Sequence, residues 1–389
     1  MISTPSILLG ALVALQATAS ASPMKQRWLY EKYFDLQGHR GGTGEAVENT
    51  LPALAWGLLA GVTSLEVDVG ITKDGVALIY HDEIIDKTKC KDTAAAWADD
   101  KMFPYVGKSV ANLTLAQIKT LDCGSLRLTA HPMAEVYPGT KLSTMDEMFD
   151  FVDCATSDPV LYNIETKVNP EKANATRSPE DFIAIMDKSF AKKDATFMDR
   201  ITHQSFDWRM AVLSKKQWPT MRTGALISDA SIYNNPNATT IANLRPGATN
   251  RLAGIDLTKV EGATVGERVA RAAKQINADN LAPAAASYTS TNPDASSPGY
   301  VSFITKDMVD TAHALGMKVK AWTINRKNAI EPLINLGVDG IITDYPSDVR
   351  VQLERNGKYL APKADYKRVM GCLKAMNQVT KDGLSTKGF

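Results

Sequence analysis

Two acidic residues and a histidine lie close together in one short stretch of the sequence. Glu66 and Asp68 alternate with apolar residues, and Asp74-Gly75 separates them from a second apolar run that leads to His81. Asp-Gly is typical of a two-residue β-hairpin loop, which would place Asp68 opposite His81 with Glu66 on the same face. Such an acid-x-acid strand is more often a solvated face. Because the intervening apolar residues would face a helical layer, however, the stretch predicts an enclosed metal site.

Two further stretches carry groups that suit a phosphate ligand. His39 and Arg40 lie within the glycine-rich segment 38–42, whose glycines allow close approach of a ligand, and the planar guanidinium of Arg40 suits phosphate oxygens. Glu165 ends another apolar run, and Lys167, two residues further on, would lie on the same face and add positive charge.

Short apolar runs recur along the chain with helical patterns between them. This alternation is typical of parallel βα units, and eight such runs predict a closed TIM (β/α)8 barrel of the α/β class. The expected strands are 34–39, the strand of Glu66, 160–165, 201–203, 223–227, a sixth among 254–256 and 276–278, then 318–323 and 340–344.

Several of these runs end in ionisable residues. His39, Glu66, Glu165 and Asp344 would therefore lie at the carboxyl ends of barrel strands, where TIM barrels form their active sites. The six-residue link after the Glu66 strand cannot hold a crossover helix, so the hairpin should rise above this rim and bring His81 back to it.

Assembled at one rim, these residues would form a site for phosphodiester chemistry. Glu66, Asp68 and Glu165 are hard oxygen ligands that suit Mg²⁺ or Ca²⁺. A cation there would neutralise charge on a phosphoryl group, while His39 and His81 exchange protons with the nucleophile and the leaving group.

Residues 82–145 form an insertion between the hairpin and the next strand, and we expect it to cover the rim as a lid. The barrel would occupy residues 30–355, and the tail 356–389 would pack outside it as helix. His131 and His313 are expected to be structural or solvated, and His203 is assigned no role.

The charge balance and the N-terminal residues indicate where the protein acts. The 44 basic and 43 acidic residues create no field that would attract nucleic acid or an anionic membrane. Residues 1–21 have the short apolar run and small-residue end of a secretory signal peptide, although basic residues are missing at its start, and no later segment could anchor the chain in a membrane. We therefore expect a secreted protein, whose glycosylation acceptors would be Asn112, Asn174 and Asn237.

Four cysteines allow three pairings in an oxidising compartment. We favour Cys90 with Cys123, which would staple the insertion, and a bond between Cys154 and Cys372 would tether the tail.

Taken together, these motifs closely resemble the glycerophosphodiester phosphodiesterase family, in order from about residue 36 to about residue 349. The segments that carry the resemblance are Gly38-His39-Arg40-Gly41, Glu48-Asn49-Thr50-Leu51-Pro52-Ala53, Leu65-Glu66-Val67-Asp68, Thr72-Lys73-Asp74-Gly75, His81-Asp82, Asn163-Ile164-Glu165-Thr166-Lys167, Ser205-Phe206, Ala321-Trp322-Thr323-Ile324-Asn325 and Ile342-Thr343-Asp344-Tyr345-Pro346.

The resemblance implies a phospholipase-C-like TIM barrel that hydrolyses a small-molecule glycerophosphodiester to an alcohol and glycerol phosphate with a divalent cation. An adjacent glycerol hydroxyl can be the first nucleophile, which gives a cyclic phosphate. The implied roles are acid–base catalysis by His39 and His81, phosphate binding by Arg40 and Lys167, metal binding by Glu66, Asp68 and Glu165, and packing of Trp322 against the glycerol, although Trp322 also suits a core position.

Two other readings remain open at this point. A relative of phospholipase D-type toxins, which attack sphingomyelin or lysophospholipids, would share the barrel, the histidines and the metal. A non-catalytic barrel that binds phosphodiesters is a further alternative.

Overall fold

The computed structural model describes residues 32–376 except 195, 235–239, 248, 288–289 and 293. The expected signal peptide and the Asn237 acceptor lie outside the described residues. Asn112 and Asn174 are both exposed. Within the described part of the chain, the helices are too short or too polar to cross a bilayer.

Eight parallel strands form a closed barrel, as predicted, with one antiparallel strand beside it. The first strand pairs with the last and also with the second, which closes the sheet. The strands are β1 Asp35–Gly38, β2 Ser64–Ile71, β3 Ala77–Ile79, β4 Leu161–Thr166, β5 Ile201–Ser205, β6 Arg222–Ile227, β7 Asn280–Pro283, β8 Lys318–Ala321 and β9 Gly340–Thr343.

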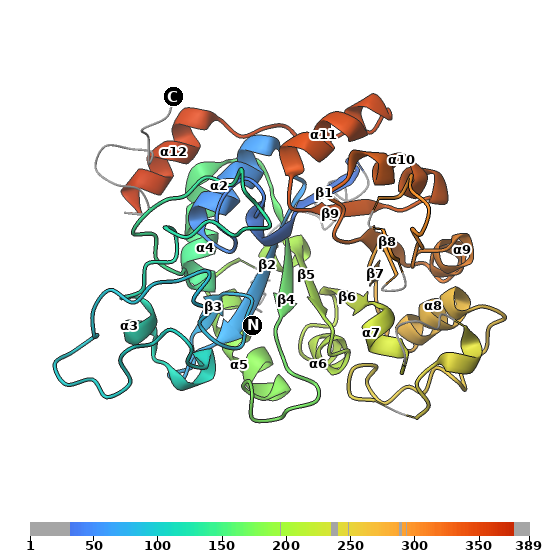
Figure 1. The fold of residues 1–389 in the computed structure, drawn as a ribbon, viewed down its shortest axis with the longest axis horizontal. Coiled ribbons are helices and arrows are strands. Elements are labelled where there is room, and N and C mark those ends of the chain that lie inside the picture. The colour runs from blue at the N-terminus through green and yellow to red at the C-terminus, as the bar shows by residue number, and fades with distance from the viewer. Residues whose placement is uncertain are drawn as a thin grey trace, which may run out of the picture.

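Helices surround the barrel, and Figure 1 shows the strands in the middle of the molecule with the helices around them. Threonine side chains cap several helices; Thr144, for example, forms a capping box with Glu147. The helices are α2 Leu51–Ala60, α3 Leu115–Ile118, α4 Met145–Ala155, α5 Pro179–Phe190, α6 Arg209–Gln217, α7 Asp229–Ile232, α8 Val265–Gln275, α9 Lys306–Ala314, α10 Lys327–Leu336, α11 Pro346–Arg355 and α12 Tyr366–Ala375, with short 3-10 turns at His39–Gly41, Val110–Asn112, Phe197–Arg200 and Ile241–Asn243.

The sixth barrel strand is β7, so both segments proposed for it were wrong. Residue 254 ends a turn and 255–256 follow it, while 276–278 come directly after helix α8 and include Asn277 with a φ of 56°. Strand β7 has only four residues, with a polar residue at one end and proline at the other. This segment is a strand because it pairs with β6 and β8. Since these contacts are long-range, the local sequence pattern gives little indication of the strand.

The apolar residues that alternate with Glu66 and Asp68 pack outward against helices. Leu65, Val67 and Val69 belong to the buried apolar core between barrel and helices. The period of two along β2 therefore turns the carboxylates of Glu66 and Asp68 to the barrel interior.

The hairpin has the predicted antiparallel pairing, but its register was wrong by one residue. Val69 pairs with Ile79, and the amide of Tyr80 donates to the Asp68 carbonyl at 2.9 Å, so Tyr80 rather than His81 lies opposite Asp68. The loop has three residues because the Thr72 hydroxyl accepts from the Val76 amide at 3.0 Å and extends the turn by one position. His81 reaches the site from the segment that follows β3.

The insertion has a small apolar core of its own, and in Figure 1 it extends to one side with α3. A disulfide joins Cys90 to Cys123 within it, as favoured from the sequence. A second disulfide joins Cys154 of α4 to Cys372 of α12, so the C-terminal helix is tethered to the barrel.

Candidate active site

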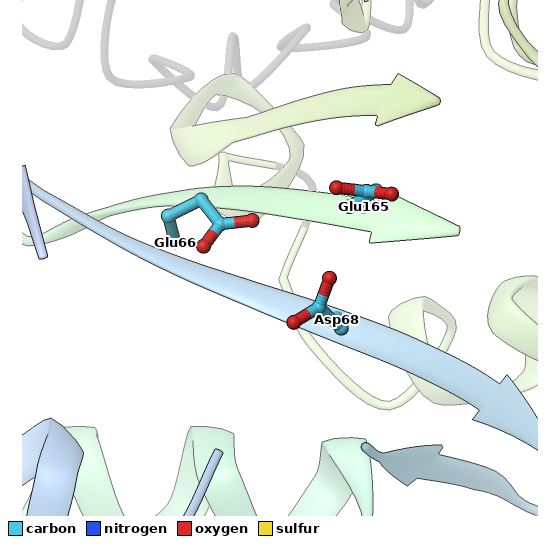
Figure 2. Close-up of side chains that lie close together, drawn as sticks. All are labelled: Glu66, Asp68 and Glu165. Atoms are coloured by element: carbon cyan, nitrogen blue, oxygen red, sulfur yellow. The ribbon is translucent and has the colours of Figure 1, made fainter. Parts of the chain in front are cut away.

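Three buried carboxylates meet at the carboxyl ends of neighbouring strands. Glu66 and Asp68 lie on β2, and Glu165 lies on β4 as the register partner of Asp68. One oxygen from each lies within 4.8 Å of the other two. Figure 2 shows two of the side chains on β2 and the third on the adjacent strand.

This donor set fits a hard divalent cation. Asp68 Oδ1 is buried and accepts no hydrogen bond from any residue that the structure describes, and the Lys167 ammonium is its ion-pair partner at 3.6 Å. Burial and the charge of Asp68 raise the pKa of Glu66. Burial opposes ionisation of Asp68 too, but His81 and Lys167 lower its pKa well below the usual range. A bound cation would relieve the repulsion among the carboxylates.

Arg40 and Lys167 bring two cations to the same cavity. The Arg40 guanidinium forms an ion pair with Glu48 at 2.8 Å, and the backbone amide of Arg40 donates to Glu66 Oε2 at 2.8 Å. Lys167 contacts Glu165 Oε1 at 2.5 Å. The chain can turn here because residue 41 is glycine: a Cβ on Gly41 would lie 2.8 Å from the backbone of α2.

In both predicted catalytic histidines, Nδ1 lies within hydrogen-bond distance of an aspartate carboxylate. His39 Nδ1 lies 2.5 Å from Asp344 Oδ1, and His81 Nδ1 lies 2.6 Å from Asp82 Oδ1. A carboxylate can only accept, so each Nδ1 carries a proton and Nε2 remains for the substrate. Burial opposes the charged form of His39, but the hydrogen bond to Asp344 and the nearby carboxylates raise its pKa.

A chain of ion pairs connects Lys89 of the insertion to Arg40 and to His81. Lys89 contacts Asp82 Oδ2 at 2.5 Å and Glu48 Oε1 at 2.7 Å. Glu48 holds Arg40, and Asp82 holds His81. Burial opposes ionisation of Asp82, but its hydrogen bonds lower its pKa to about 2.

Several residues that support the histidines and carboxylates lie in the family-like segments, but the sequence did not indicate a role for them. Asp344 and Asp82 orient the histidines, and Asn49 donates from Nδ2 to Asp68 Oδ2 at 2.8 Å. Gln204 donates to Glu66 Oε1 at 3.2 Å from β5. The position of Gln204 next to the predicted strand 201–203 was the available signal, whereas Lys89 had none in its local sequence.

The remaining histidines have different surroundings. His203 is buried between Thr166 and Ser214, and burial lowers its pKa to about 4. His313 pairs with Asp339, which precedes β9 and so lies at the opposite end of this strand from Asp344. His131 has its Nδ1 3.1 Å from the Tyr345 hydroxyl and its Nε2 3.8 Å from Asp344 Oδ2.

The residues predicted to act in catalysis surround a cavity of about 110 Å³. Trp322 is half-buried at this cavity, where its ring meets Phe206 edge-on with centroids 5.4 Å apart and its Nε1 donates to the Ala282 carbonyl at 2.7 Å. All of the predicted site residues except Asp68 line the cavity, namely His39, Arg40, Glu66, His81, Glu165, Lys167 and Trp322. Asp68 lies in the carboxylate cluster beside it.

A TIM barrel with such a rim defines a phosphodiesterase-type enzyme. The model of the glycerophosphoryl diester phosphodiesterase family matches residues 39–348. The chain belongs to this family, which confirms the resemblance seen in the sequence and makes the protein an enzyme of the glycerophosphodiester phosphodiesterase class.

Individual relatives agree with this assignment. A glycerophosphodiester phosphodiesterase of Caldanaerobacter subterraneus is 25% identical over 82% of this chain and 97% of that protein. One from Bacillus subtilis is 23% identical over 86% of this chain and 92% of that protein. The structure of an Oleispira antarctica phosphodiesterase in complex with the product sn-glycerol-3-phosphate shares the fold, with a TM-score of 0.56 and 20% identity over 84% of this chain and 99% of that one.

Proposed function

We propose that this protein hydrolyses glycerophosphodiesters to an alcohol and glycerol phosphate, with a divalent cation and with His39 and His81 as the acid–base pair. The observation that carries the proposal is the pairing of two carboxylate-bound histidines around one cavity that also contains Arg40 and Lys167. Proton transfer by two positioned side chains is what phosphodiester cleavage needs at its attacking and leaving oxygens.

Glu66, Asp68 and Glu165 would hold the cation, either Mg²⁺ or Ca²⁺, which when bound supplies positive charge that stabilises the charge developing on the phosphoryl oxygens. Arg40 and Lys167 orient the phosphate by charge-assisted hydrogen bonds.

The histidines then move the protons. A glycerol hydroxyl attacks phosphorus and passes its proton to Nε2 of one histidine, while the bond from phosphorus to the alcohol oxygen breaks and that oxygen takes a proton from the other histidine. Water opens the resulting cyclic phosphate with the two roles reversed, which gives glycerol phosphate and restores both rings. Each proton transfer is typically worth about 10²–10⁴ in rate.

The groove on the His81 side of the cavity favours a water-soluble diester over a lysophospholipid. A groove on the His81 side is lined by charged residues that include Asp82, Glu83, Glu171 and Arg251. An acyl chain placed there would desolvate these groups without giving them new partners, which is unfavourable. A purely binding role does not require two histidines oriented by carboxylates.

Secretion is part of the proposal. The signal-like segment 1–21 supports it, and so do the disulfides, because all four cysteines of the chain form intramolecular bonds of the kind that persist in oxidising compartments.

Phosphorus NMR on glycerophosphocholine and lysophosphatidylcholine in parallel tests this function, with chelation and re-addition of Mg²⁺ or Ca²⁺. We expect cation-dependent turnover of glycerophosphocholine that falls at least about 10²-fold in His39→Ala and in His81→Ala. His313→Ala is the matched control, because His313 also pairs with an aspartate but lies away from the rim. Exclusive turnover of the lysolipid, or normal rates in either rim variant, would contradict the proposal.

A further inference from the structure

Two grooves of different size adjoin the catalytic cavity. The wide groove, of about 850 Å³, shares Trp322 and Thr323 with the cavity. The narrow groove, of about 330 Å³, shares His81 and Lys167 with it. Asp344, which holds His39, lines the wide groove, so each catalytic histidine is associated with one groove.

The substrate of the proposed reaction also has two arms. When phosphate occupies the cavity, the attacking and leaving oxygens lie roughly in line on opposite sides of phosphorus. The glycerol arm and the alcohol arm must therefore extend in different directions, one toward each groove.

The narrow groove suits the constant arm. Its polar groups are held in place by one another, since Asn169 Nδ2 donates to Glu83 Oε1 at 2.6 Å and Arg251 pairs with Glu171 at 3.0 Å. Fixed polar groups in a small space can recognise the two hydroxyls of glycerol. A ligand arm without these hydroxyls would leave the donors and acceptors of the groove unsatisfied, which is unfavourable.

The wide groove suits the variable arm. Its walls come from segments outside the strands. The insertion supplies His131, the segment after β7 supplies Tyr300, and further lining residues, such as Tyr345, follow β8 and β9. Aromatic rings of Tyr300 and Tyr345 stand beside polar side chains there, a mixture that suits a hydroxylated or amino alcohol.

His131 is the residue of the insertion best placed to contact that arm. Its side chain is 13% exposed, and its ring meets Tyr345 edge-on at 5.8 Å while Nδ1 lies 3.1 Å from the Tyr345 hydroxyl. These contacts fix the imidazole at the wall of the wide groove, 3.8 Å from the Asp344 carboxylate that positions His39.

We propose that the wide groove is the subsite for the alcohol arm, which it accepts as a polar amino alcohol or polyol, and that His131 determines specificity for that arm. The inference rests on the proposed function and extends it to the leaving alcohol. It also assigns a binding role to the insertion.

The test compares kcat/KM for two diesters that share the glycerol arm, glycerophosphoinositol and glycerophosphomethanol. His131→Ala should lower the inositol-to-methyl ratio of kcat/KM about 10-fold, the usual effect of one lost polar contact in a binding site. A residue that acted only through Asp344 and His39 would instead lower kcat equally for both esters. Because the ratio is measured within one preparation, partial loss of folded protein does not alter it.

Asn169→Ala in the narrow groove is the matched variant. It should reduce kcat/KM for both esters by the same factor, since both carry glycerol. An unchanged ratio in His131→Ala, or a ratio that shifts in Asn169→Ala instead, would overturn the assignment while leaving the proposed function intact. A wild-type protein that cleaves glycerophosphocholine but neither of these esters would overturn the subsite alone, and one that cleaves none of the three diesters would overturn the proposed function as well.

Discussion

Asp344→Asn is the substitution that tests most directly how the site orients His39. The Asp344 carboxylate accepts two hydrogen bonds, one from His39 Nδ1 at 2.5 Å and one from the Asn325 side-chain amide. Asn325 cannot turn to compensate, because its Oδ1 already accepts from the backbone amide of residue 344 at 3.0 Å. An asparagine at 344 offers one acceptor and one donor, so in either orientation its amide donor faces another donor or forces His39 into the other tautomer.

The size of the effect has a lower and an upper bound. Loss of a hydrogen bond to a charged group costs about 1.5–3 kcal/mol, which corresponds to a decrease in kcat/KM of about 10- to 150-fold. If His39 adopts the wrong tautomer, its whole contribution to proton transfer is lost, and the decrease reaches about 10⁴-fold. We expect the loss mainly in kcat, because Asp344 contacts neither Arg40 nor Lys167, the residues proposed to bind the phosphate.

The assay is turnover of glycerophosphocholine by Asp344→Asn, by His39→Ala and by the double variant. Because Asp344 acts through His39, the double variant should be no slower than His39→Ala. Asp339→Asn is the matched control, since Asp339 contacts His313 at 2.8 Å at the other end of β9, and it should retain kcat whatever it costs in stability.

Two results would refute this reasoning. The first is a kcat/KM for Asp344→Asn within about threefold of the wild-type value, which is well below the lower bound given above. The second is additive losses in the double variant, which would mean that Asp344 and His39 act independently.

Three further predictions concern the metal, the insertion and the core. Glu66→Gln should raise the concentration of Mg²⁺ or Ca²⁺ needed for half-maximal activity at least about 10-fold, because it removes a charged ligand; an unchanged metal titration would argue against that role. Lys89→Met should reduce the free energy of unfolding by about 1–3 kcal/mol and lower turnover, because Asp82 and Glu48 lose their shared partner, and urea unfolding without a change in midpoint would contradict this. His203 has a pKa of about 4 when folded and about 6.5 when unfolded, so the unfolded chain binds more protons between these values and stability falls as pH decreases through them. Between pH 7.5 and pH 5 the free energy of unfolding should decrease by about 2 kcal/mol through this group. His203→Gln should lack this decrease when urea midpoints at the two pH values are compared. Equal pH dependence of stability in both proteins would contradict the prediction.

Local patterns predicted most of the barrel because apolar periodicity reflects which face of a strand is buried. Seven of the eight parallel strands lie where the sequence placed them, whereas β7 was missed because its four residues become a strand only through pairing with β6 and β8. The register of the hairpin failed for a similar reason. The Thr72 hydroxyl, rather than Asp74-Gly75 alone, decides how long the turn is.

The sequence by itself determined which chemical groups are available and at which end of the barrel they lie. All parallel strands end at the same rim, so residues such as Glu66 and Glu165 had to meet once the strands were identified. The order of the motifs also determined the family.

Only the tertiary structure decided the partners of these groups. His39 and Asp344 are 305 positions apart in the chain, and their hydrogen bond forms because β1 and β9 close the barrel side by side. Lys89 and His131 reach the rim through the folding of the insertion, whose shape depends on its own core and disulfide. Such contacts depend on how distant segments pack, and no local periodicity records that packing.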